Sequence, residues 1–228
     1  MPKINLLTVC TDDYPIEYAE ILHKRFSQVS KLNVDHFCIT DRPDCVSGWA
    51  SPIEPCVAAS GWWNKLNLFS GAMPAGWLLY MDLDIVIQDN FDREIKWAVK
   101  QNRKIACVSD AIGWMGVKFS SSLMVLKSGS SQEYFRQFKQ LWPSLNERAG
   151  GDQVWLGPQL KNVLYLDKKF PNLKKNLKFH LAKECNGTLT LPFTISDEVK
   201  LVDCGGRPKP HELQQLSYVR TNWHEVLA

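Results

Sequence analysis

The chain has 228 residues, of which 45% are hydrophobic and 22% are charged, and its formal net charge is +3. A chain of this length and composition can bury a sizeable core, and it needs neither a metal nor a disulfide merely to fold. The charge is too small to indicate a nucleic-acid partner. No stretch approaches the roughly 20 apolar residues of a membrane span. We therefore expect a single globular α/β domain over residues 1–228.

The seven cysteines are scattered along the chain, and no two of them have C-x-x-C spacing. This spacing disfavours a structural zinc site, and cysteines in apolar surroundings behave as small hydrophobic residues. The N-terminus has neither the apolar run nor the cleavage-site pattern of a signal peptide. These features together predict a cytoplasmic protein.

The first part of the chain alternates strand and helix patterns. We expect a strand over 3–10, a helix over about 15–29 capped by Asp12 or Asp13, and a strand over 34–40. A long connection over 41–62, rich in Pro, Gly, Ser and Trp, leads to a short amphipathic helix at 63–70.

The pattern continues in the second part. Strands are expected over 77–87, 104–110 and 121–129, with a helix over 131–142 whose aromatic stripe belongs to the core and another helix beginning within 150–160. Strands that alternate with helices predict a doubly wound, mainly parallel sheet flanked by helices.

Asp82 and Asp84 interrupt the apolar strand pattern GWLLYMDLDIVIQ. On one strand they would point to the same face, at the edge where α/β sheets bind ligands. Burying two unpaired carboxylates is costly, and a divalent cation such as Mg²⁺ or Mn²⁺ would remove that cost. Alternatively, the acids cap the next turn or pair with Lys or Arg.

Further motifs surround this acidic pair. In chain order they are NKLNLF at 64–69, the D-x-D strand, SSLMVLKSG at 121–129, GGDQVWL at 150–156 and LVDCGGRPKP at 201–210. This series resembles the GT-A glycosyltransferases, particularly the glycogenin-like family-8 nucleotide-sugar transferases, from the first strand to about residue 210. The resemblance implies a nucleotide-binding half over about 1–90 and an acceptor and sugar half over about 91–228.

The resemblance implies a cation, Mn²⁺ or Mg²⁺, held by Asp82 and Asp84 against the donor diphosphate. Asp203 stands where the family usually has a histidine as third ligand, so three carboxylates would form the site. Lys209 corresponds to the family lysine that grips the diphosphate, and Gly206 beside Gly205 would let the backbone approach it closely.

Other donor contacts are implied on the same basis. The turn TVCTDDY corresponds to the nucleotide-binding turn and suggests Thr8, Cys10, Thr11 and Tyr14. Lys65 corresponds to a lysine that reaches the donor, although a solvated helix lysine is the alternative.

The donor sugar has its own implied contacts. Ser121 and Ser122 fall where small polar groups face it, or are simply strand-end serines. Asp152 and Gln153 match the G-D-Q motif, whose acid binds sugar hydroxyls and whose amide lies near the reacting face. A helix N-cap is the alternative for Asp152.

The implied activity is hexosyl transfer from a nucleotide-diphosphate sugar, with UDP the usual carrier, to a hydroxyl acceptor and with retention of configuration. The acceptor is left open among a glycan, a lipid, a protein and a small molecule. An inverting enzyme would need a carboxylate base, for which Asp110 and Asp152 are candidates. Trp62, Trp63 and Trp114 are candidates to line the acceptor groove.

Two other classes compete with this interpretation. The D-x-D strand also resembles the first motif of haloacid-dehalogenase-type phosphatases, but Leu156 stands where their second acid belongs. A GT-A protein that binds a nucleotide or glycan without catalysis is the other class, and the missing histidine at 203 supports it. The basic stretch 168–183 is interpreted as a solvated face.

Overall fold

A computed structural model describes residues 2–12, 14–110, 113–147, 150–177, 195–214 and 216–227. Asp13, His180 and Cys185, as well as the end of the basic stretch, lie outside the described residues. The strands are β1 (Ile4–Val9), β2 (Val34–Ile39), β3 (Ser51–Ile53), β4 (Trp77–Met81), β5 (Ile85–Ile87), β6 (Ile105–Ser109), β7 (Phe119–Lys127), β8 (Leu164–Tyr165), β9 (Lys174–Asn176) and β10 (Leu201–Asp203).

The helices include five α-helices. These are α1 (Ile16–Val29), α2 (Asp92–Lys100), α3 (Gln132–Leu141), α4 (Gly151–Leu156) and α6 (Ser217–Asn222). The 3₁₀ segments are η1 (Pro43–Cys45), η2 (Gly61–Phe69), η3 (Trp114–Gly116), η4 (Ser144–Glu147), η5 (Gly157–Gln159), η7 (Pro210–Glu212) and η8 (His224–Val226). No helix in this described part of the chain combines the length and apolar character that a membrane crossing requires.

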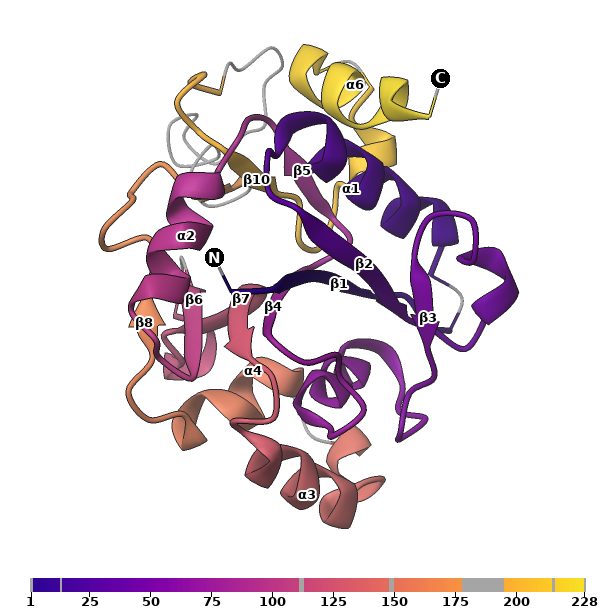
Figure 1. The fold of residues 1–228 in the computed structure, drawn as a ribbon, viewed down its shortest axis with the longest axis vertical. Helices are drawn as coiled ribbons and strands as arrows, with labels where there is room; N and C mark the ends of the chain where they lie inside the picture. Colours follow the sequence, from indigo (N-terminus) through magenta and orange to yellow (C-terminus); the bar gives the residue numbers. More distant parts are fainter. Residues whose placement is uncertain are drawn as a thin grey trace.

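Seven strands form the central sheet in the order β3-β2-β1-β4-β7-β6-β8. The first four are parallel to one another, β7 runs antiparallel to β4 and β6, and β8 is parallel to β6. A second sheet has the order β5-β10-β9. The mostly parallel α/β architecture predicted from the alternation is confirmed, and Figure 1 shows helices on both sides of the central sheet.

Each face of the central sheet is covered by its own apolar layer. Leu79 and Met81 of β4 pack in one cluster, to which α1 and α2 contribute side chains such as Phe26 and Ile95. The intervening β4 residues, including Leu78, face the opposite cluster with residues of η2, α3 and α4. This alternation follows from the two-residue period of a strand, and it places the end of β4 between two buried layers.

A third apolar cluster joins α1 to the second sheet and the C-terminal segment. Tyr18 of α1 packs there with Val86 of β5, Val202 of β10 and Trp223. Figure 1 shows α6 beside α1 at the top of the view, while α3 and α4 lie at the opposite end. The C-terminal segment therefore returns to the N-terminal helix and brings residues after β10 beside the end of β4.

Some predicted elements differ from those observed. The predicted helix at 63–70 is the 3₁₀ segment η2, and α1 begins after Pro15 without a side-chain cap from Asp12. Asp12 instead has a φ of 57° and accepts a hydrogen bond from the Gly61 amide, which ties the first turn to η2. In the predicted aromatic stripe of α3, Phe138 is fully buried but Leu141 is 40% exposed.

Candidate active site

The strand predicted over 77–87 is wrong as a single element, because the chain turns at Asp82–Asp84. β4 ends at Met81, the Asp82 amide donates to the Ser122 carbonyl, and the Ile85 amide donates to the Asp82 carbonyl. The following residues form β5 and pair with β10 in the second sheet. The two acids therefore stand on a turn between the sheets instead of on one strand face.

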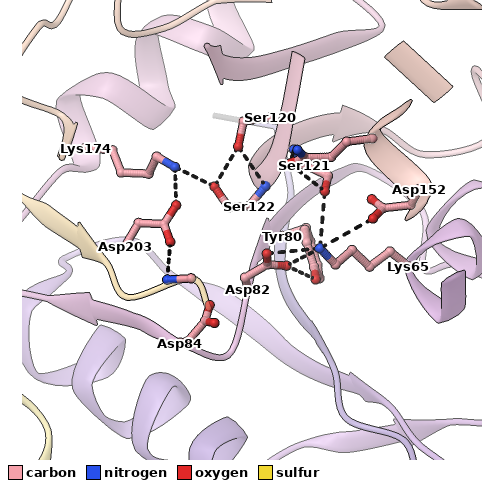
Figure 2. A network of polar contacts seen from close by, with 12 residues as sticks. Lys65, Tyr80, Asp82, Asp84, Ser120, Ser121, Ser122, Asp152, Lys174 and Asp203 are labelled. Atoms are coloured by element: carbon pink, nitrogen blue, oxygen red, sulfur yellow. Dashed lines mark hydrogen bonds and ion pairs between the residues drawn. The ribbon is translucent and has the colours of Figure 1, made fainter. Parts of the chain in front are cut away.

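Asp82 is held by a cluster of polar side chains that Figure 2 shows at close range. The Lys65 ammonium lies 3.0 Å from Asp82 and donates to Ser121 Oγ over 3.2 Å. The buried Tyr80 hydroxyl donates to Asp82 Oδ1 over 2.5 Å. Burial and the neighbouring Asp82 carboxylate raise the pKa of Tyr80, so its hydroxyl remains a donor.

Asp152 completes this cluster from the first turn of α4. Its Oδ1 lies 3.9 Å from the Lys65 ammonium, while its buried Oδ2 has no hydrogen-bond partner among the described residues. Burial raises the pKa of Asp152, and the charge of Lys65 opposes that rise. A buried carboxylate oxygen without a partner is costly, so this atom is a candidate for binding a ligand hydroxyl.

Two glycines bring α4 into this position. Gly150 and Gly151 have φ values of +90° and +63°, which favour glycine. A Cβ on Gly151 would lie 2.3 Å from Trp62 Nε1, so the start of the helix is pressed against that indole. Gln153, in the same helix, accepts a hydrogen bond from the Ser121 amide over 2.9 Å through its side chain. This contact fixes α4 to β7.

Asp84 faces a different lysine. Its Oδ2 accepts a hydrogen bond from the Lys209 ammonium over 2.6 Å. The same ammonium lies 5.7 Å from the centroid of the Tyr14 ring, within the range of a cation–π contact. Burial raises the pKa of Asp84, and the charges of Asp82 and Asp203 add to the rise, which places all three carboxylates in one electrostatic neighbourhood.

Asp203 ends β10 and pairs with Lys174 of β9. The Lys174 ammonium donates to Asp203 Oδ2 and also to Ser122 Oγ, the latter over 2.7 Å (Figure 2). Asp203 Oδ1 accepts the Gly205 amide over 2.8 Å. Although burial opposes the change, the Lys174 ammonium holds the pKa of Asp203 below its ordinary value.

Two clefts adjoin these acids. The Tyr14 cleft, with a volume of about 800 Å³, is lined by residues that include Thr11, Tyr14, Trp62, Lys65, Asp82, Asp84, Gly206 and Lys209. The Lys174 cleft, with a volume of about 380 Å³, is lined by residues that include Asp82, Asp110, Ser122, Gln153, Lys174 and Asp203. Asp82 and Gly205 line both clefts, so the clefts adjoin at the D-x-D turn.

Most residues predicted for the site are brought together, but three candidates point elsewhere. Thr8 is fully buried, and its hydroxyl contacts His23 Nε2 over 3.0 Å. Cys10 is fully buried as well, and its thiol contacts the Tyr14 carbonyl. Trp63 is buried in the core beside Trp142, so its predicted place in an acceptor groove is wrong. The Trp114 side chain lies outside the described residues.

Lys174 and Tyr80 are the site residues that the sequence motifs missed. Lys174 belongs to the basic stretch interpreted as a solvated face, yet its side chain is only 7% exposed. Nothing in a run of lysines distinguishes the buried one, and strand alternation from the buried Leu173 and Leu177 would place Lys175, not Lys174, on their face. Tyr80 precedes Asp82 by two residues, and that spacing on a strand indicates a shared face.

The donor atoms suit a hard divalent cation only in part. Asp82 and Asp84 offer carboxylate oxygens. The site has one more carboxylate than it has lysines: four acids (Asp82, Asp84, Asp152 and Asp203) against three lysines (Lys65, Lys174 and Lys209). Among the described residues, however, no three His, Cys, Asp or Glu side chains are grouped closely enough to hold a metal ion. The described side chains alone therefore do not form a metal site, and a cation at Asp82 and Asp84 would have to complete its shell from a ligand.

The fold and the position of the acids define the structural class. A mostly parallel central sheet flanked by helices, with the D-x-D turn at the end of its central strand β4, is the GT-A architecture, and solved glycosyltransferases match the chain over nearly its whole length. No protein-family model and no curated protein sequence matches it.

Three of the matching structures illustrate the likeness. GlyE, a glycosyltransferase of Streptococcus pneumoniae TIGR4, has a TM-score of 0.66 and 12% identity over 99% of this chain and 63% of its own. The galactosyltransferase LgtC, in complex with donor and acceptor sugar analogues, has a TM-score of 0.64 and 10% identity over 97% of this chain and 94% of its own. The bifunctional glycosyltransferase WbbM has a TM-score of 0.62 and 11% identity over 100% of this chain and 50% of its own.

The chain thus spans less than two thirds of GlyE and half of WbbM, but nearly all of LgtC. At these low identities the likeness establishes the GT-A fold.

Proposed function

We propose that this protein is a glycosyltransferase that moves a hexosyl group from a nucleotide-diphosphate sugar, UDP-linked in our proposal, to a hydroxyl acceptor. The observation that carries the proposal is the convergence of two acids, two lysines and one amide on two adjoining clefts, namely Asp82, Asp84, Lys65, Lys209 and Gln153. Asp152 lies behind Lys65, 3.9 Å from its ammonium. The GT-A fold shared with known glycosyltransferases supports it.

We assign different parts of the substrates to the two clefts. The Tyr14 cleft is lined largely by residues before 90, including the aromatic rings of Tyr14 and Trp62, and we assign it the nucleotide. Flat aromatic faces suit a nucleobase, and Lys209 lies where it can exchange Asp84 for a phosphate oxygen. The Lys174 cleft, lined mainly by residues after 107, would then hold the sugar and the acceptor.

A divalent cation, Mn²⁺ or Mg²⁺, is part of this proposal. With all four site carboxylates ionised, the excess of one negative charge would repel a diphosphate, and a bound cation would reverse that sign. When bound, such an ion neutralises negative charge that grows on the departing diphosphate. Asp82 and Asp84 are the side chains that would hold it.

The protein's own side chains bind and position the donor sugar. Lys65, with its charge shared between Asp82 and Asp152, positions these carboxylates, and the carboxylates in turn raise the pKa of the buried Lys65. The Oδ2 of Asp152 is buried and has no partner among the described residues, so we propose that a sugar hydroxyl reaches it when the donor binds. Gln153, anchored on Ser121, lines the cleft on the side of the reacting sugar.

We propose that configuration is retained, with the acceptor proton passing to the leaving diphosphate. In this scheme the protein contributes positioning and charge stabilisation and needs no strong nucleophile. If the enzyme inverts, Asp110, which lines the Lys174 cleft, is the better-placed candidate base, because Asp152 faces Lys65.

The decisive experiment is a thermal-shift panel of nucleoside diphosphates and sugar nucleotides with and without Mn²⁺, followed by turnover assays. A UDP-specific stabilisation with release of sugar to acceptor or water supports the proposal. Stabilisation without turnover indicates the non-catalytic binding protein. Hydrolysis of phosphomonoesters alone indicates the phosphatase, which the shared GT-A fold disfavours.

The family-8 assignment and a cytoplasmic location belong to the same proposal. The motif order supports the former. For the latter, the six described cysteines are free thiols, as expected in a reducing compartment.

A further inference from the structure

We propose that Asp203 acts as the counter-ion of Lys174 and not as a metal ligand, so that Asp82 and Asp84 alone hold the cation together with the donor diphosphate. This inference rests on the proposed function, since it concerns the ion that accompanies the donor. It assigns Lys174 a positioning role that no sequence motif indicated.

The first support is that both oxygens of Asp203 are already engaged. Oδ1 accepts the Gly205 amide over 2.8 Å, and Oδ2 accepts the Lys174 ammonium. Figure 2 shows one side of the carboxylate turned toward the Lys174 ammonium. A cation coordinated by Asp203 would have to compete with a charge-assisted hydrogen bond, which is the stronger class. Both oxygens of Asp82 are engaged too, by Tyr80 and Lys65, so the two acids differ in how readily their lysine partners can leave.

The second support is that the Lys174–Asp203 pair is more deeply buried than the other lysine pairs of the site. The side chains of Lys174 and Asp203 are 7% and 8% exposed, whereas those of Lys65 and Lys209 are 15% and 26% exposed. Lys65 and Lys209 both line the Tyr14 cleft and can turn to an arriving phosphate. Separating the buried pair instead would leave a charge unpaired in the interior, at a large cost.

The third support is that Lys174 is fixed by more than its ion pair. Its ammonium also donates to Ser122 Oγ, which lies on β7 one residue beyond the serine that contacts Lys65. Lys174 therefore bridges the second sheet to the central sheet beside the D-x-D turn. It places an ammonium group where the family resemblance implies a third metal ligand.

The consequence concerns the affinity for the cation. A site with two carboxylates binds a divalent ion more weakly than one with three, because ligand charge is a main determinant of affinity. Removing the Lys174 charge would leave the Asp203 carboxylate unpaired near Asp84, free to turn toward the ion as a third oxygen ligand. The wild-type protein should therefore depend on the donor phosphates to retain the ion, and a variant without Lys174 should not.

The test measures Mn²⁺ binding by the electron paramagnetic resonance signal of free Mn²⁺, with and without UDP, on the full chain. Lys174→Met should bind Mn²⁺ about 10-fold more tightly than the wild type in the absence of UDP, because an additional charged ligand becomes available. The double variant K174M/D203N, which removes both charges, should bind Mn²⁺ as the wild type does. A gain of affinity is a signature that general structural damage does not produce.

Two further variants serve as references. Lys175→Met changes the next residue of β9, which lines the same cleft, and should leave Mn²⁺ affinity unchanged. Asp84→Asn removes an assigned ligand and should weaken Mn²⁺ binding in the presence of UDP at least about 10-fold.

The proposal is overturned if K174M/D203N loses Mn²⁺ affinity as strongly as D84N, because Asp203 would then be a ligand in the wild type. It is also overturned if K174M binds Mn²⁺ no more tightly than K175M. If the wild type binds UDP but takes up no Mn²⁺ with it, the inference fails while donor binding stands. If it binds neither UDP nor Mn²⁺, the proposed function fails as well.

Discussion

Lys65 of η2 lies 3.0 Å from Asp82 at the end of β4, so the first acid of the D-x-D turn is held by the connection that precedes its strand. Asp152 approaches the same ammonium from α4, at 3.9 Å. One lysine therefore balances two carboxylates that come from separate elements. The Lys65 side chain is 15% exposed, so water screens its attraction to the two carboxylates less than it screens an ion pair on the surface.

Replacing Lys65 should consequently affect both stability and ligand binding. Lys65→Met leaves Asp82 and Asp152 facing each other without a cation, and we expect a loss of up to about 3 kcal/mol in the free energy of unfolding. Affinity for a nucleoside diphosphate should fall too, because the site becomes more negative. Urea denaturation and calorimetric titration with UDP measure the two effects.

A surface pair provides the matched control. Lys3 contacts Asp35 over 2.6 Å, but both side chains are more than half exposed. Lys3→Met should cost less than about 1 kcal/mol, in line with exposed ion pairs, and should leave UDP affinity unchanged. Equal effects of K3M and K65M would contradict a special role for Lys65.

The contact between Gly151 and Trp62 leads to a second prediction. A Cβ at position 151 would meet the Trp62 indole at 2.3 Å, and the backbone there has a φ of +63°. Gly151→Ala should destabilise the fold by about 1–3 kcal/mol through overpacking, with about 1–2 kcal/mol more from the left-handed backbone. Because Trp62 is 58% exposed, it can be removed to relieve the overpacking alone.

A double-mutant cycle separates these contributions. When Trp62→Ala is combined with G151A, the part of the lost free energy of unfolding that comes from overpacking should be recovered. The part that comes from the left-handed backbone should remain, as measured by urea denaturation. Gly48→Ala is the control, since nothing lies within 4 Å of the Cβ that it would add. Strict additivity of W62A and G151A would show that the indole does not limit position 151.

The sequence predicted the alternation of strands and helices and most of the polar residues at the site. It did so because apolar periodicity reports burial directly, and because motif residues such as Lys65 and Asp152 lie on elements whose order follows the chain. It did not reveal that the chain turns between Met81 and Ile85. Ile85 to Ile87 are as apolar as β4, and only their pairing with β10 distinguishes the second strand.

The partners of the acids could not be predicted for a related reason. Lys174 and Asp203 meet because β9 and β10 are neighbours, and that pairing is a long-range contact with no local signal. The side-chain direction of Thr8 and Cys10 is also set by packing against α1 and β2, not by the turn motif that contains them. Motif position thus indicated the region of the site, while tertiary contacts determined which side chains enter it.

Thiol reactivity is the third prediction. Burial raises the pKa of Cys10 to about 12 and that of Cys38 to about 11, and it raises the pKa of Cys107 as well. Cys45 and Cys56 are exposed. Since the thiolate is the reactive form, iodoacetamide at pH 8 should label Cys45 and Cys56 in the folded protein and leave Cys10, Cys38 and Cys107 unmodified.

Peptide mass spectrometry identifies the labelled positions. Denaturation in guanidinium before labelling is the control, and it should make all of these thiols react. Labelling of Cys10 in the native protein at the rate of Cys56 would contradict its burial beneath the turn. UDP should not change the rate of iodoacetamide labelling at Cys38 or Cys107, since neither residue lines the Tyr14 cleft.

A buried histidine pair makes stability depend on pH. His23 of α1 is 1% exposed, with Nε2 contacting the Thr8 hydroxyl and Nδ1 lying 2.8 Å from His36 Nδ1. Burial, followed by the neighbouring His36, lowers the pKa of His23 well below its ordinary value. Burial also lowers the pKa of His36, against the charge of Asp35.

The sign of the effect follows from these two depressed pKa values. Below about pH 6.5 the unfolded chain takes up protons on both histidines while the folded protein does not, so the free energy of unfolding falls as the pH falls. Each histidine contributes a slope of up to about 1.4 kcal/mol per pH unit. The raised pKa values of Asp84 and Asp152 act in the opposite direction, since the folded state then binds the protons.

His23→Asn isolates the histidine contribution, because asparagine keeps a polar atom near the Nδ1 position that faces His36 but does not titrate. Between pH 7 and pH 5 the wild type should lose stability more steeply than H23N, by up to about 1.4 kcal/mol per pH unit, in urea denaturation at each pH. The comparison depends on slopes, so any constant cost of the substitution cancels. Parallel curves for the two proteins would mean that His23 is protonated equally in the folded and unfolded states, which is incompatible with its buried contact to His36.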